Sequence, residues 1–372
     1  MKRREFIKTA GLGAAAGTAL LAAQAPAQTW GPQVNWRMAA IWPKSLDTLY
    51  GGADLIGKRV AAATGGKFNI KVFAAGEIVG GLQVLDAVQN GTVECGHTAT
   101  YYYFGKDPTF AFSCAIPFGL NGRQQNAWMY HGGGLELMRE FFKEYNIIQF
   151  PAGNTGCQMG GWFRKPINKV SDLKGLKMRI GGTGGLPLTK LGVVPQQIAG
   201  GDIYPALEKG TVDAAEWVGP YDDEKLGFAK VAKYYYYPGW WEGGPELDLL
   251  VNIKAWEALP AEYKAILEAA CAEANVWMVA KYDAVNPDAL KRLIAGGVKL
   301  QPFSNEIMAA CYKAATEVYD EFATKNAKFR KVYEPWKKFR ADQDEWFAVA
   351  ESRFDNFMIA VSRLSQGAKK KG

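Results

Sequence analysis

The sequence predicts an α/β protein with two interlaced lobes and a long C-terminal helix. Short apolar runs alternate with longer amphipathic runs, which is typical of βαβ units and parallel sheets. The length of 372 residues is enough for about two domains. No Pro/Ser-rich linker divides the chain, so two lobes would have to be joined by segments that cross between them.

The first half of the chain alternates strands and helices. We expect strands at residues 35–42, 68–73 and 93–99, and helices at residues 44–64 and 80–90. Gly65 and Gly66 follow the first of these helices and should end it, because glycine tolerates the backbone conformation found just after a helix. Two later passages from helix to strand are expected at residues 142–151 and 176–180.

Helices are most clearly indicated in the last third of the chain. Pro260 suits the first turn of a helix over residues 261–284. The Asn286-Pro287-Asp288 segment should break the helical pattern, and Gly296-Gly297 should stop it. Ser304 can cap a further helix that runs to about Asn326.

A stripe of apolar side chains continues from Pro335 almost to the end of the chain. Its members are Trp336, Phe339, Trp346, Ala350, Phe354, Phe357, Val361 and Leu364. From Trp346 onward, spacings of three and four residues place them on one face of a helix of about 30 residues. Such a helix must bury that face, either along both lobes of its own chain or against a second subunit.

The N-terminus is typical of an export signal. Residues 1–28 combine a basic start, an uncharged run at residues 9–23 and a small-residue cleavage site at Ala25-Pro26-Ala27. The uncharged run is too short to span a bilayer comfortably. Residues 3–8, Arg-Arg-Glu-Phe-Ile-Lys, match the twin-arginine pattern. We therefore expect a twin-arginine signal peptide over residues 1–27 and a mature protein in the periplasm.

Composition excludes several classes of protein. Much of the formal charge of +7 lies in the leader and in three C-terminal lysines, so the body is close to neutral and has no electrostatic footprint for nucleic acid. Two histidines and five cysteines without a CxxC pair offer no multi-histidine or zinc-ribbon site. We expect the cysteines to be buried hydrophobes and His97 and His131 to be structural. The glycine-rich residues 181–185 lack the Lys-Ser/Thr of a P-loop, and no serine lies in a GxSxG elbow.

Polar and aromatic residues among small ones mark three candidate binding stretches, at residues 98–104, 153–162 and 213–244. Arg179 ends a predicted strand and offers a planar fork for a carboxylate. Glu216 and Glu242 could act as an acid/base pair or as oxygen ligands of a hard cation. An acid/base pair would need a nucleophile or proton-transfer partner, which no motif supplies. A cation site needs only neutral oxygens, for which Gln158 and backbone carbonyls would serve.

These residues resemble a known family. The chain is similar to the periplasmic solute-binding subunits of tripartite ATP-independent (TRAP) transporters, of the dicarboxylate-binding type. The resemblance rests on the leader, the Pro166-Ile167 pair, the Asp-Leu-Lys-Gly-Leu-Lys-Met-Arg block at residues 172–179 and the Leu-Glu-Lys-Gly-Thr-Val-Asp-Ala block at residues 207–214. It implies a two-lobe periplasmic binding protein fold with hinge helices, and it makes Arg179 the arginine that grips a carboxylate.

Two departures from the commonest pattern point to a narrower group. Gln158 stands where many members have an arginine, and Trp217 follows Glu216 where many have asparagine. Both departures, with residues 101–103, 153–163, 216–225 and 238–244, resemble the subfamily that binds 2-oxo acids such as pyruvate. In that subfamily a sodium ion bridges protein and ligand, although a lactate-binding relative uses calcium.

The resemblance implies roles for individual residues. The metal would be held by Gln158, Glu216, the backbone carbonyl of Trp217 and Glu242. The ligand would be bound by Arg179 and Gln158, by hydrogen bonds from Tyr101, Tyr102 and Asn154, and by Trp217 as a wall for its alkyl chain. The exchange of Arg for Gln at position 158 removes a fixed cation and adds a neutral oxygen, which is consistent with a bound metal ion.

The expected domains follow from the same resemblance. Lobe I would comprise residues 28–155 and about 246–288, and lobe II residues 156–245 and about 289–334. The helix over residues 335–372 would exchange between two subunits of a homodimer.

The leading function is capture of a small 2-oxo acid for a TRAP membrane permease. The alternatives are a binder of a 2-hydroxy acid such as lactate with calcium, a receptor that signals to a membrane kinase, and an enzyme acting on 2-oxo acids.

Overall fold

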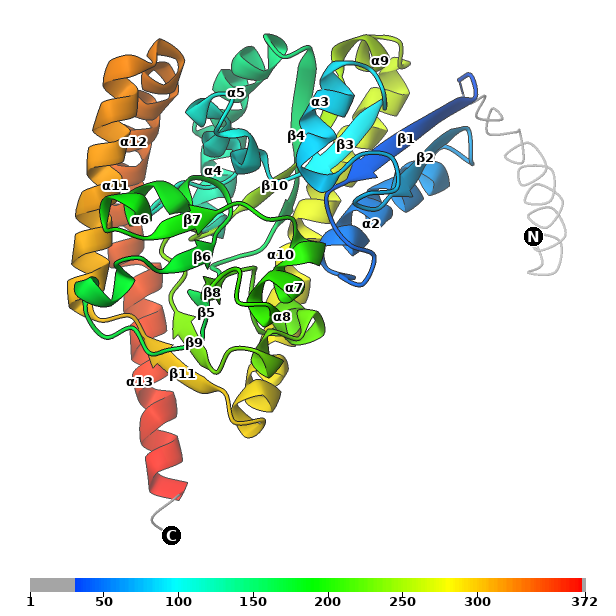
Figure 1. Cartoon of the computed structure of the whole chain (residues 1–372). Helices are drawn as coiled ribbons and strands as arrows, with labels where there is room; N and C mark the ends of the chain where they lie inside the picture. The colour runs from blue at the N-terminus through cyan, green and yellow to red at the C-terminus, as the bar shows by residue number, and fades with distance from the viewer. Residues whose placement is uncertain (1–30, 370–372) are drawn as a thin grey trace, which may run out of the picture. The chain divides into compact units, whose positions relative to one another are not determined.

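The computed structural model describes residues 31–369, with side chains up to residue 363. The expected signal peptide, residues 1–27, lies outside the described residues. From Val34 onward the chain forms two β-sheets surrounded by helices (Figure 1). No helix among residues 31–369 is both long enough and apolar enough to cross a membrane.

The first sheet has the strand order β2-β1-β3-β10-β4. Strand β1 runs parallel to β2 and β3, whereas β10 is antiparallel to both β3 and β4. Its strands are β1 (Val34–Ala40), β2 (Phe68–Phe73), β3 (Cys95–Thr98), β4 (Ile147–Asn154) and β10 (Glu246–Asn252). The late strand β10 therefore lies between two early strands.

The second sheet has the order β11-β9-β5-β8-β6-β7 and is also mixed, because β5 is antiparallel to β8 and β9. Its strands are β5 (Gly161–Phe163), β6 (Lys177–Arg179), β7 (Val194–Gln196), β8 (Ala214–Ala215), β9 (Tyr234–Tyr237) and β11 (Lys299–Pro302). The expectation of parallel sheets was thus wrong in part. Where the chain crosses from one sheet to the other without a helix, at β4–β5 and β9–β10, the arriving strand enters antiparallel to its neighbours.

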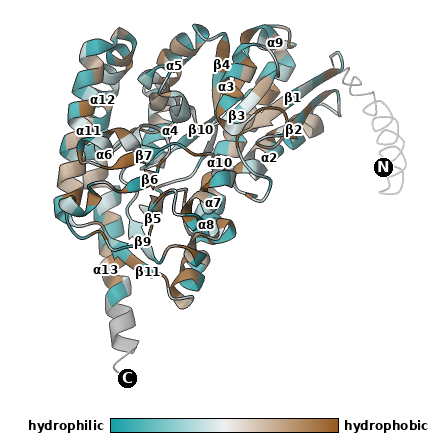
Figure 2. Cartoon of the chain, in the orientation of Figure 1, coloured by the Kyte–Doolittle hydropathy of each residue, from teal (hydrophilic) through white to brown (hydrophobic). Residues whose placement is uncertain are grey.

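Helices cover both sheets. They are α2 (Leu49–Ala63), η1 (Gly81–Gln83), α3 (Val84–Gln89), η2 (Thr100–Tyr103), η3 (Pro108–Ser113), α4 (Gly122–His131), α5 (Gly134–Lys143), η4 (Val170–Leu173), η5 (Gly182–Gly184), α6 (Gly185–Lys190), η6 (Gly200–Asp202), α7 (Ile203–Glu208), α8 (Pro220–Leu226), η7 (Phe228–Lys230), α9 (Ile253–Glu257), α10 (Ala261–Ala295), α11 (Asn305–Lys325), α12 (Ala327–Val349) and α13 (Glu351–Lys369). In Figure 2 much of the ribbon of α12 has the teal colour of hydrophilic residues. The predicted early strands and helices are present, with ends shifted by a few residues.

Helix α10 runs unbroken for 35 residues and contains Pro287 in its interior. The predicted break at residues 286–288 was therefore wrong. A proline removes one backbone donor, but packing against α2, β4 and α8 holds the two halves of the helix in line. The side chain of Asn286 also accepts a hydrogen bond from the backbone N–H of Tyr221, at 3.0 Å.

The predicted cap of α11 is confirmed, because the Ser304 hydroxyl accepts a hydrogen bond from the backbone N–H of Ile307 at 3.2 Å. Asn326 ends this helix and caps the next, accepting the N–H groups of Lys328 and Phe329. Helix α12 thus begins eight residues before Pro335, which lies inside it. The predicted single terminal helix is divided at Ala350 into α12 and α13.

The terminal aromatic stripe divides into two parts. Trp336 packs against Phe112 and Phe339 against Trp128, with ring centroids 5.8 and 5.4 Å apart, so these two side chains are covered by their own chain. Among the rest, three large aromatic side chains are exposed, at 57% for Trp346, 65% for Phe354 and 66% for Phe357. Leu364 lies outside the described side chains. The expectation that the whole stripe needs a second subunit is therefore wrong for its first two members.

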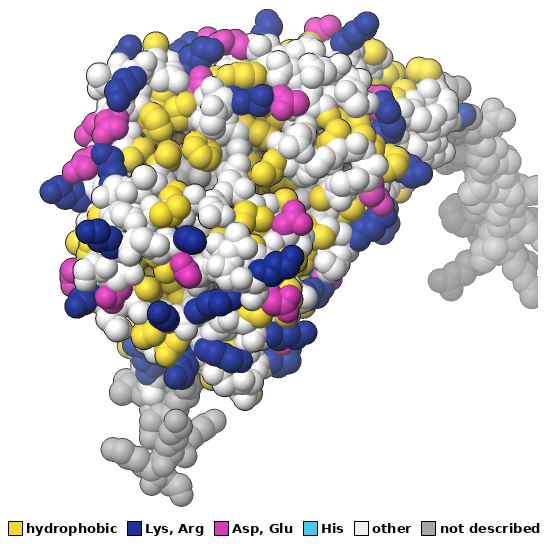
Figure 3. Space-filling model, viewed as in Figure 1, with side chains coloured by type: hydrophobic (Ala, Val, Ile, Leu, Met, Phe, Trp, Pro, Cys, Tyr) yellow, Lys and Arg dark blue, Asp and Glu magenta, His cyan; other side chains and the backbone are white. Residues whose placement is uncertain are grey.

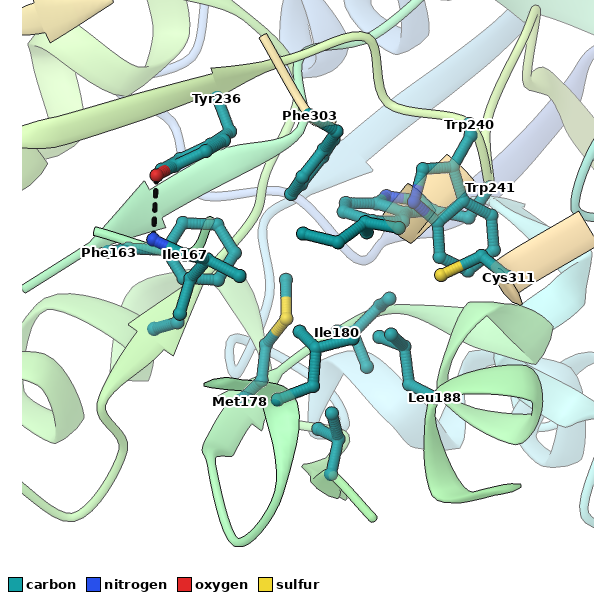
Figure 4. Packing of buried hydrophobic residues seen from close by; sticks show 14 residues of the cluster. Phe163, Ile167, Met178, Ile180, Leu188, Tyr236, Trp240, Trp241, Phe303 and Cys311 are labelled. Carbon is teal, nitrogen blue, oxygen red and sulfur yellow. Dashed lines mark hydrogen bonds between the residues drawn. The ribbon is translucent and has the colours of Figure 1, made fainter. Parts of the chain in front are cut away.

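The core of the second sheet is a dense aromatic and aliphatic cluster (Figure 4). Within it the Tyr236 ring stacks on Phe303 at 5.0 Å, and the Tyr236 hydroxyl accepts the backbone N–H of Ile167 at 2.7 Å. Trp240 and Trp241 extend this cluster toward the segment that returns to the first sheet. On the outer face, Lys and Arg side chains are interspersed with Asp and Glu (Figure 3).

Candidate functional site

The site forms where the chain crosses between the two sheets. Gln158 lies on the segment from β4 to β5, and Glu242 lies on the segment from β9 to β10. Backbone hydrogen bonds join these segments, because the N–H of Gln158 donates to the carbonyl of Glu242 at 3.1 Å and the N–H of Gly239 donates to the carbonyl of Gln158 at 2.8 Å. Side chains from residues 84 positions apart are thereby fixed beside one another.

Arg179, the last residue of β6, is 1% exposed and almost fully engaged. Its Nη1 donates to both the carbonyl and the carboxylate of Glu216, at 2.7 and 2.5 Å, and its Nε donates to the carbonyl of Ile198 at 3.0 Å. Its Nη2 donates to the Tyr102 hydroxyl at 3.1 Å. A guanidinium has five N–H groups, so one hydrogen, on Nη2, is left for a ligand. The predicted two-pronged grip would require Tyr102 or Glu216 to move.

Glu216 follows β8 and is the buried counter-ion of Arg179. Burial raises its pKa, while Arg179 and the backbone N–H of Gly181 act in the opposite direction. For Arg179, burial would lower the pKa, but the Glu216 carboxylate holds it above its usual value. Burial is the largest influence, so the pKa of Glu216 is raised despite its ion pair with Arg179.

Glu242 has no comparable partner. Burial and then the charge of Glu216 raise its pKa well above the usual range, although Tyr101 and Arg179 oppose the shift. No hydrogen bond of ordinary geometry reaches either of its carboxylate oxygens. An unpaired buried carboxylate is costly, and its retention indicates a missing positive partner or a proton.

Unpartnered oxygens gather at this point of the fold. Within the described chain, the side-chain oxygens without a hydrogen-bond partner include Gln158 Oε1, Glu216 Oε2, and Oε1 and Oε2 of Glu242. Two carboxylates and an amide oxygen are the donors that hard cations prefer. No group of three or more His, Cys, Asp or Glu side chains in residues 31–363 is arranged to hold a metal, so an ion here would need neutral oxygens as well. The donors present fit a hard cation.

A small cavity lies against Gln158, whereas Arg179, Glu216 and Glu242 are not among the residues that line it. It is lined by Trp42, Leu49, Tyr101, Tyr102, Thr155, Gln158, Trp217, Val218 and Leu247. About 10 Å³ of it is open to the centre of a water molecule, which is close to the minimum for one water. The fold described here is thus tightly closed, and any organic ligand that enters must be small and must widen the cavity.

Trp217 forms one wall and is itself tightly held. The Arg179 guanidinium lies over its ring at 5.1 Å, and Trp42 meets it edge-on at 6.2 Å. Its far edge rests on Gly200, where a Cβ would come within 2.5 Å of the indole. Gly182 has φ of +56°, and a Cβ at this position would come within 2.4 Å of the Tyr101 ring. Glycine at these two positions lets the aromatic walls approach the cavity.

Asn154 bonds to backbone groups in this structure. Its Nδ2 donates to the carbonyl of Gly244 at 3.2 Å, and its Oδ1 accepts the N–H of Gly156 at 2.8 Å. It is fully buried and does not line the cavity. The side chain therefore ties together the two crossing segments, and these bonds use one of its two Nδ2 hydrogens.

The cavity has walls that sequence reasoning did not select. Trp42 follows β1, and its indole N–H donates to Nδ1 of His97 at 2.7 Å, while Nε2 of His97 lies 3.1 Å from the carbonyl of Ala152. Burial lowers the pKa of His97 to about 4, so the ring is neutral and structural, as expected. The position of Trp42 beyond the carboxyl end of a strand was a usable signal. Nothing in the sequence marked Leu49 or Leu247 as a cavity residue.

A polar latch outside the cavity joins the β1–α2 loop to α8 and α10. Asp47 is bound by Lys225, by Lys281 at 2.7 Å and by the Tyr221 hydroxyl at 3.2 Å. Partial burial would raise the pKa of Asp47, but the two lysines lower it to about 2. In the next layer Asp222 accepts hydrogen bonds from Thr48 and from Tyr282, each at 2.6 Å, and burial raises its pKa to about 6.

All five cysteines belong to the described part of the chain and are free. Cys95, Cys114, Cys271 and Cys311 are buried, as expected, whereas Cys157 is exposed.

Comparison with known proteins places this geometry in a family. Residues 38–326 match the model of the bacterial extracellular solute-binding proteins, family 7 (DctP). The monocarboxylate 2-oxoacid-binding periplasmic protein of Nostoc is 56% identical over 361 residues, which cover 96% of this chain and 99% of that protein.

Two crystal structures are similar over most of the chain. A TRAP solute-binding protein of Bordetella bronchiseptica, a mixed-occupancy dimer with calcium and picolinate in one site, is 56% identical with a TM-score of 0.89, covering 90% of this chain and all of that one. A TRAP protein of Pseudoalteromonas atlantica with bound sodium and pyruvate is 39% identical with a TM-score of 0.85, covering 87% and 99%. The family match and this likeness lead to one conclusion: the chain belongs to the bacterial extracellular solute-binding proteins of family 7 and is a periplasmic solute-binding protein of the TRAP type.

Proposed function

We propose that this protein captures a small 2-oxo monocarboxylate such as pyruvate together with a bridging hard cation and delivers the acid to a TRAP permease. The observation that carries the proposal is the set of four unpartnered, buried oxygens on Gln158, Glu216 and Glu242, of which Gln158 lines the small cavity. Relatives named for 2-oxo acids or crystallised with pyruvate support the ligand class.

Different residues would bind the cation and the organic ligand. Gln158, Glu216, Glu242 and the Trp217 carbonyl would hold the cation, and a bound cation would supply positive charge to the carboxylate and oxo oxygens of the ligand. Arg179 offers its remaining Nη2 hydrogen to the ligand carboxylate, and Tyr101 and Tyr102 offer hydroxyl groups from the cavity wall. Trp217 excludes bulky alkyl groups.

A thermal-shift and calorimetry series tests this function. Protein freed of metals would be titrated with pyruvate in potassium buffer, then with sodium or calcium added. We expect tight binding only with one of the added cations. Equal pyruvate affinity in metal-stripped and replenished protein would contradict the bridging cation.

The same series decides between the ligand alternatives. Sodium is the expected ion, as in the pyruvate-bound protein of Pseudoalteromonas atlantica, and calcium is the alternative, as in the pyruvate-bound protein of Colwellia psychrerythraea and in the Bordetella protein. Preference for lactate with calcium would favour the 2-hydroxy acid alternative. Conversion of pyruvate during an NMR time course would favour an enzyme, and a genetic neighbourhood with a kinase and without permease genes would favour a sensor.

We also propose that the exposed part of the terminal stripe pairs two copies of the chain. Trp346, Phe354 and Phe357 are each more than half exposed and follow one another along α12 and α13. Aromatic residues in such number are rarely left in water, and the Bordetella relative is a dimer. Light scattering of the full chain and of a form truncated after Val349 tests this. The full chain should be dimeric and the truncated form, if it still binds pyruvate, monomeric. A full chain that stays monomeric at high concentration would contradict it.

Export by the twin-arginine route is the last part of the proposal. It rests on Arg3-Arg4 and the small-residue site at Ala25-Pro26-Ala27. Replacement of both arginines by lysine should leave the protein in the cytoplasm, which cell fractionation measures; unchanged periplasmic recovery would contradict this route.

A further inference from the structure

Asp223, on α8, is a buried carboxylate with donors on both oxygens. Its Oδ2 accepts hydrogen bonds from the Trp162 indole at 2.9 Å and from the Tyr235 hydroxyl at 2.6 Å. Its Oδ1 accepts the backbone N–H of Val218 at 3.3 Å. The first two contacts anchor Asp223 in the second sheet, and the third reaches the wall of the cavity.

The Val218 N–H belongs to the same peptide group as the Trp217 carbonyl. This peptide is trans, since the cis bond in the described chain is Tyr237–Pro238. In a planar trans peptide the N–H and the carbonyl point in opposite directions, so a group that holds the N–H also sets the direction of the carbonyl.

The carbonyls on either side are already occupied. The carbonyl of Glu216 accepts Arg179 Nη1 at 2.7 Å, and the carbonyl of Val218 accepts the N–H of Met159 at 3.0 Å. No donor in residues 31–363 bonds to the carbonyl of Trp217. The Trp217 carbonyl therefore has no protein partner, although the carbonyls of its two neighbours, Glu216 and Val218, each have one.

We propose that Asp223 is a positioning residue for the cation site: by holding the Val218 N–H it directs the Trp217 carbonyl toward the cation. A hydrogen bond to a carboxylate also polarises the peptide and makes its carbonyl oxygen a better ligand. This inference rests on the proposed function, because it assumes that the Trp217 carbonyl is a ligand.

Asp223→Asn is the informative change. The new asparagine has a single carbonyl oxygen, which should face Trp162 and Tyr235, where the hydrogen bonds are shorter. Its NH₂ group would then lie opposite the Val218 N–H, and the hydrogen bond to that N–H would be lost. Tyr235→Phe is the matched control, since it removes a donor to the other oxygen and leaves the Val218 contact intact. A merely structural Asp223 would make the two variants alike.

The sequence allows a direct readout. Trp217-Val218 is the single Trp-Val pair in the chain. Protein labelled with carbonyl-¹³C tryptophan and ¹⁵N valine therefore gives one cross-peak that reports this peptide alone. We expect that peak to move when calcium is added without pyruvate. We expect Asp223→Asn to weaken calcium binding by about tenfold or more, and Tyr235→Phe to change it less than about threefold.

The outcomes are separable. If other signals show that wild-type protein binds calcium while the Trp217-Val218 peak stays fixed, the inference is overturned; the same holds if Asp223→Asn binds calcium like wild type. Wild-type protein that binds neither calcium nor sodium would instead overturn the proposed function. If Asp223→Asn does not fold, the wild-type peak alone decides.

Discussion

Glu242→Gln should make the metal-free protein more stable and less able to respond to a cation. Neither carboxylate oxygen of Glu242 has a hydrogen-bond partner, and burial and Glu216 raise its pKa well above the usual range. At pH 8 the folded state must therefore keep an unpaired buried charge or take up a proton. Removing the charge at nearly constant shape should raise the free energy of unfolding by about 1–3 kcal/mol.

The assay is urea unfolding at pH 8 in metal-free potassium buffer, repeated with sodium or calcium and pyruvate. The cation should stabilise wild type strongly and Glu242→Gln little. Glu246→Gln is the matched control, because Glu246 is also buried with both carboxylate oxygens unpartnered but is not one of the proposed cation ligands. Glu246→Gln should show a similar rise in the free energy of unfolding and should still be stabilised by the cation.

Glu216→Gln should behave in the opposite way without metal. It breaks a buried ion pair with Arg179 and should lower the free energy of unfolding by about 3 kcal/mol. Loss of stability in metal-free Glu242→Gln, or an undiminished response of that variant to the cation, would refute the reasoning for Glu242.

Three further perturbations probe other parts of the site. Arg179→Lys retains charge but loses the planar set of donors, so pyruvate binding measured by calorimetry should weaken by about 2 kcal/mol or more; unchanged affinity would remove Arg179 from the site. Gly200→Ala should displace the Trp217 indole and weaken binding of a branched 2-oxo acid more than of pyruvate, and equal losses would contradict this role of the wall. Asp222 has a folded pKa of about 6, above its ordinary 3.8, so its ionisation destabilises the fold as pH rises through 6. Asp222→Asn should accordingly match wild type near pH 4 and exceed its unfolding free energy by up to about 3 kcal/mol at pH 8, whereas a pH-independent difference would contradict it.

Local signals in the sequence predicted local structure well. Ser304 and the Gly65-Gly66 pair mark helix ends correctly, because capping and left-handed backbone depend on a few neighbouring residues. The helix break predicted at Pro287 was wrong because packing against elements far away in the sequence overrides the local effect of proline. The antiparallel insertion of β10 was not predictable from pattern, since it depends on pairing across more than 90 residues.

The candidate site shows the same division. Gln158, Glu216 and Glu242 were selectable as oxygen donors, and the structure brings their unpartnered oxygens to one place. The engagement of Arg179 by Glu216 and Ile198, and the use of Asn154 to bind backbone, could not be seen in the sequence. Both depend on how the crossing segments meet, which residue type does not reveal.

The place of β10 in the first sheet has a consequence for biosynthesis. When the ribosome has made residues 31–154, the sheet still lacks the strand that must lie between β3 and β4. The second sheet in turn waits for β11, which follows the long α10. The first sheet cannot complete its hydrogen bonding until β10 ends at residue 252, and the second sheet until β11 ends at residue 302 of the 372, so early chains expose strand edges and depend on late, long-range pairing.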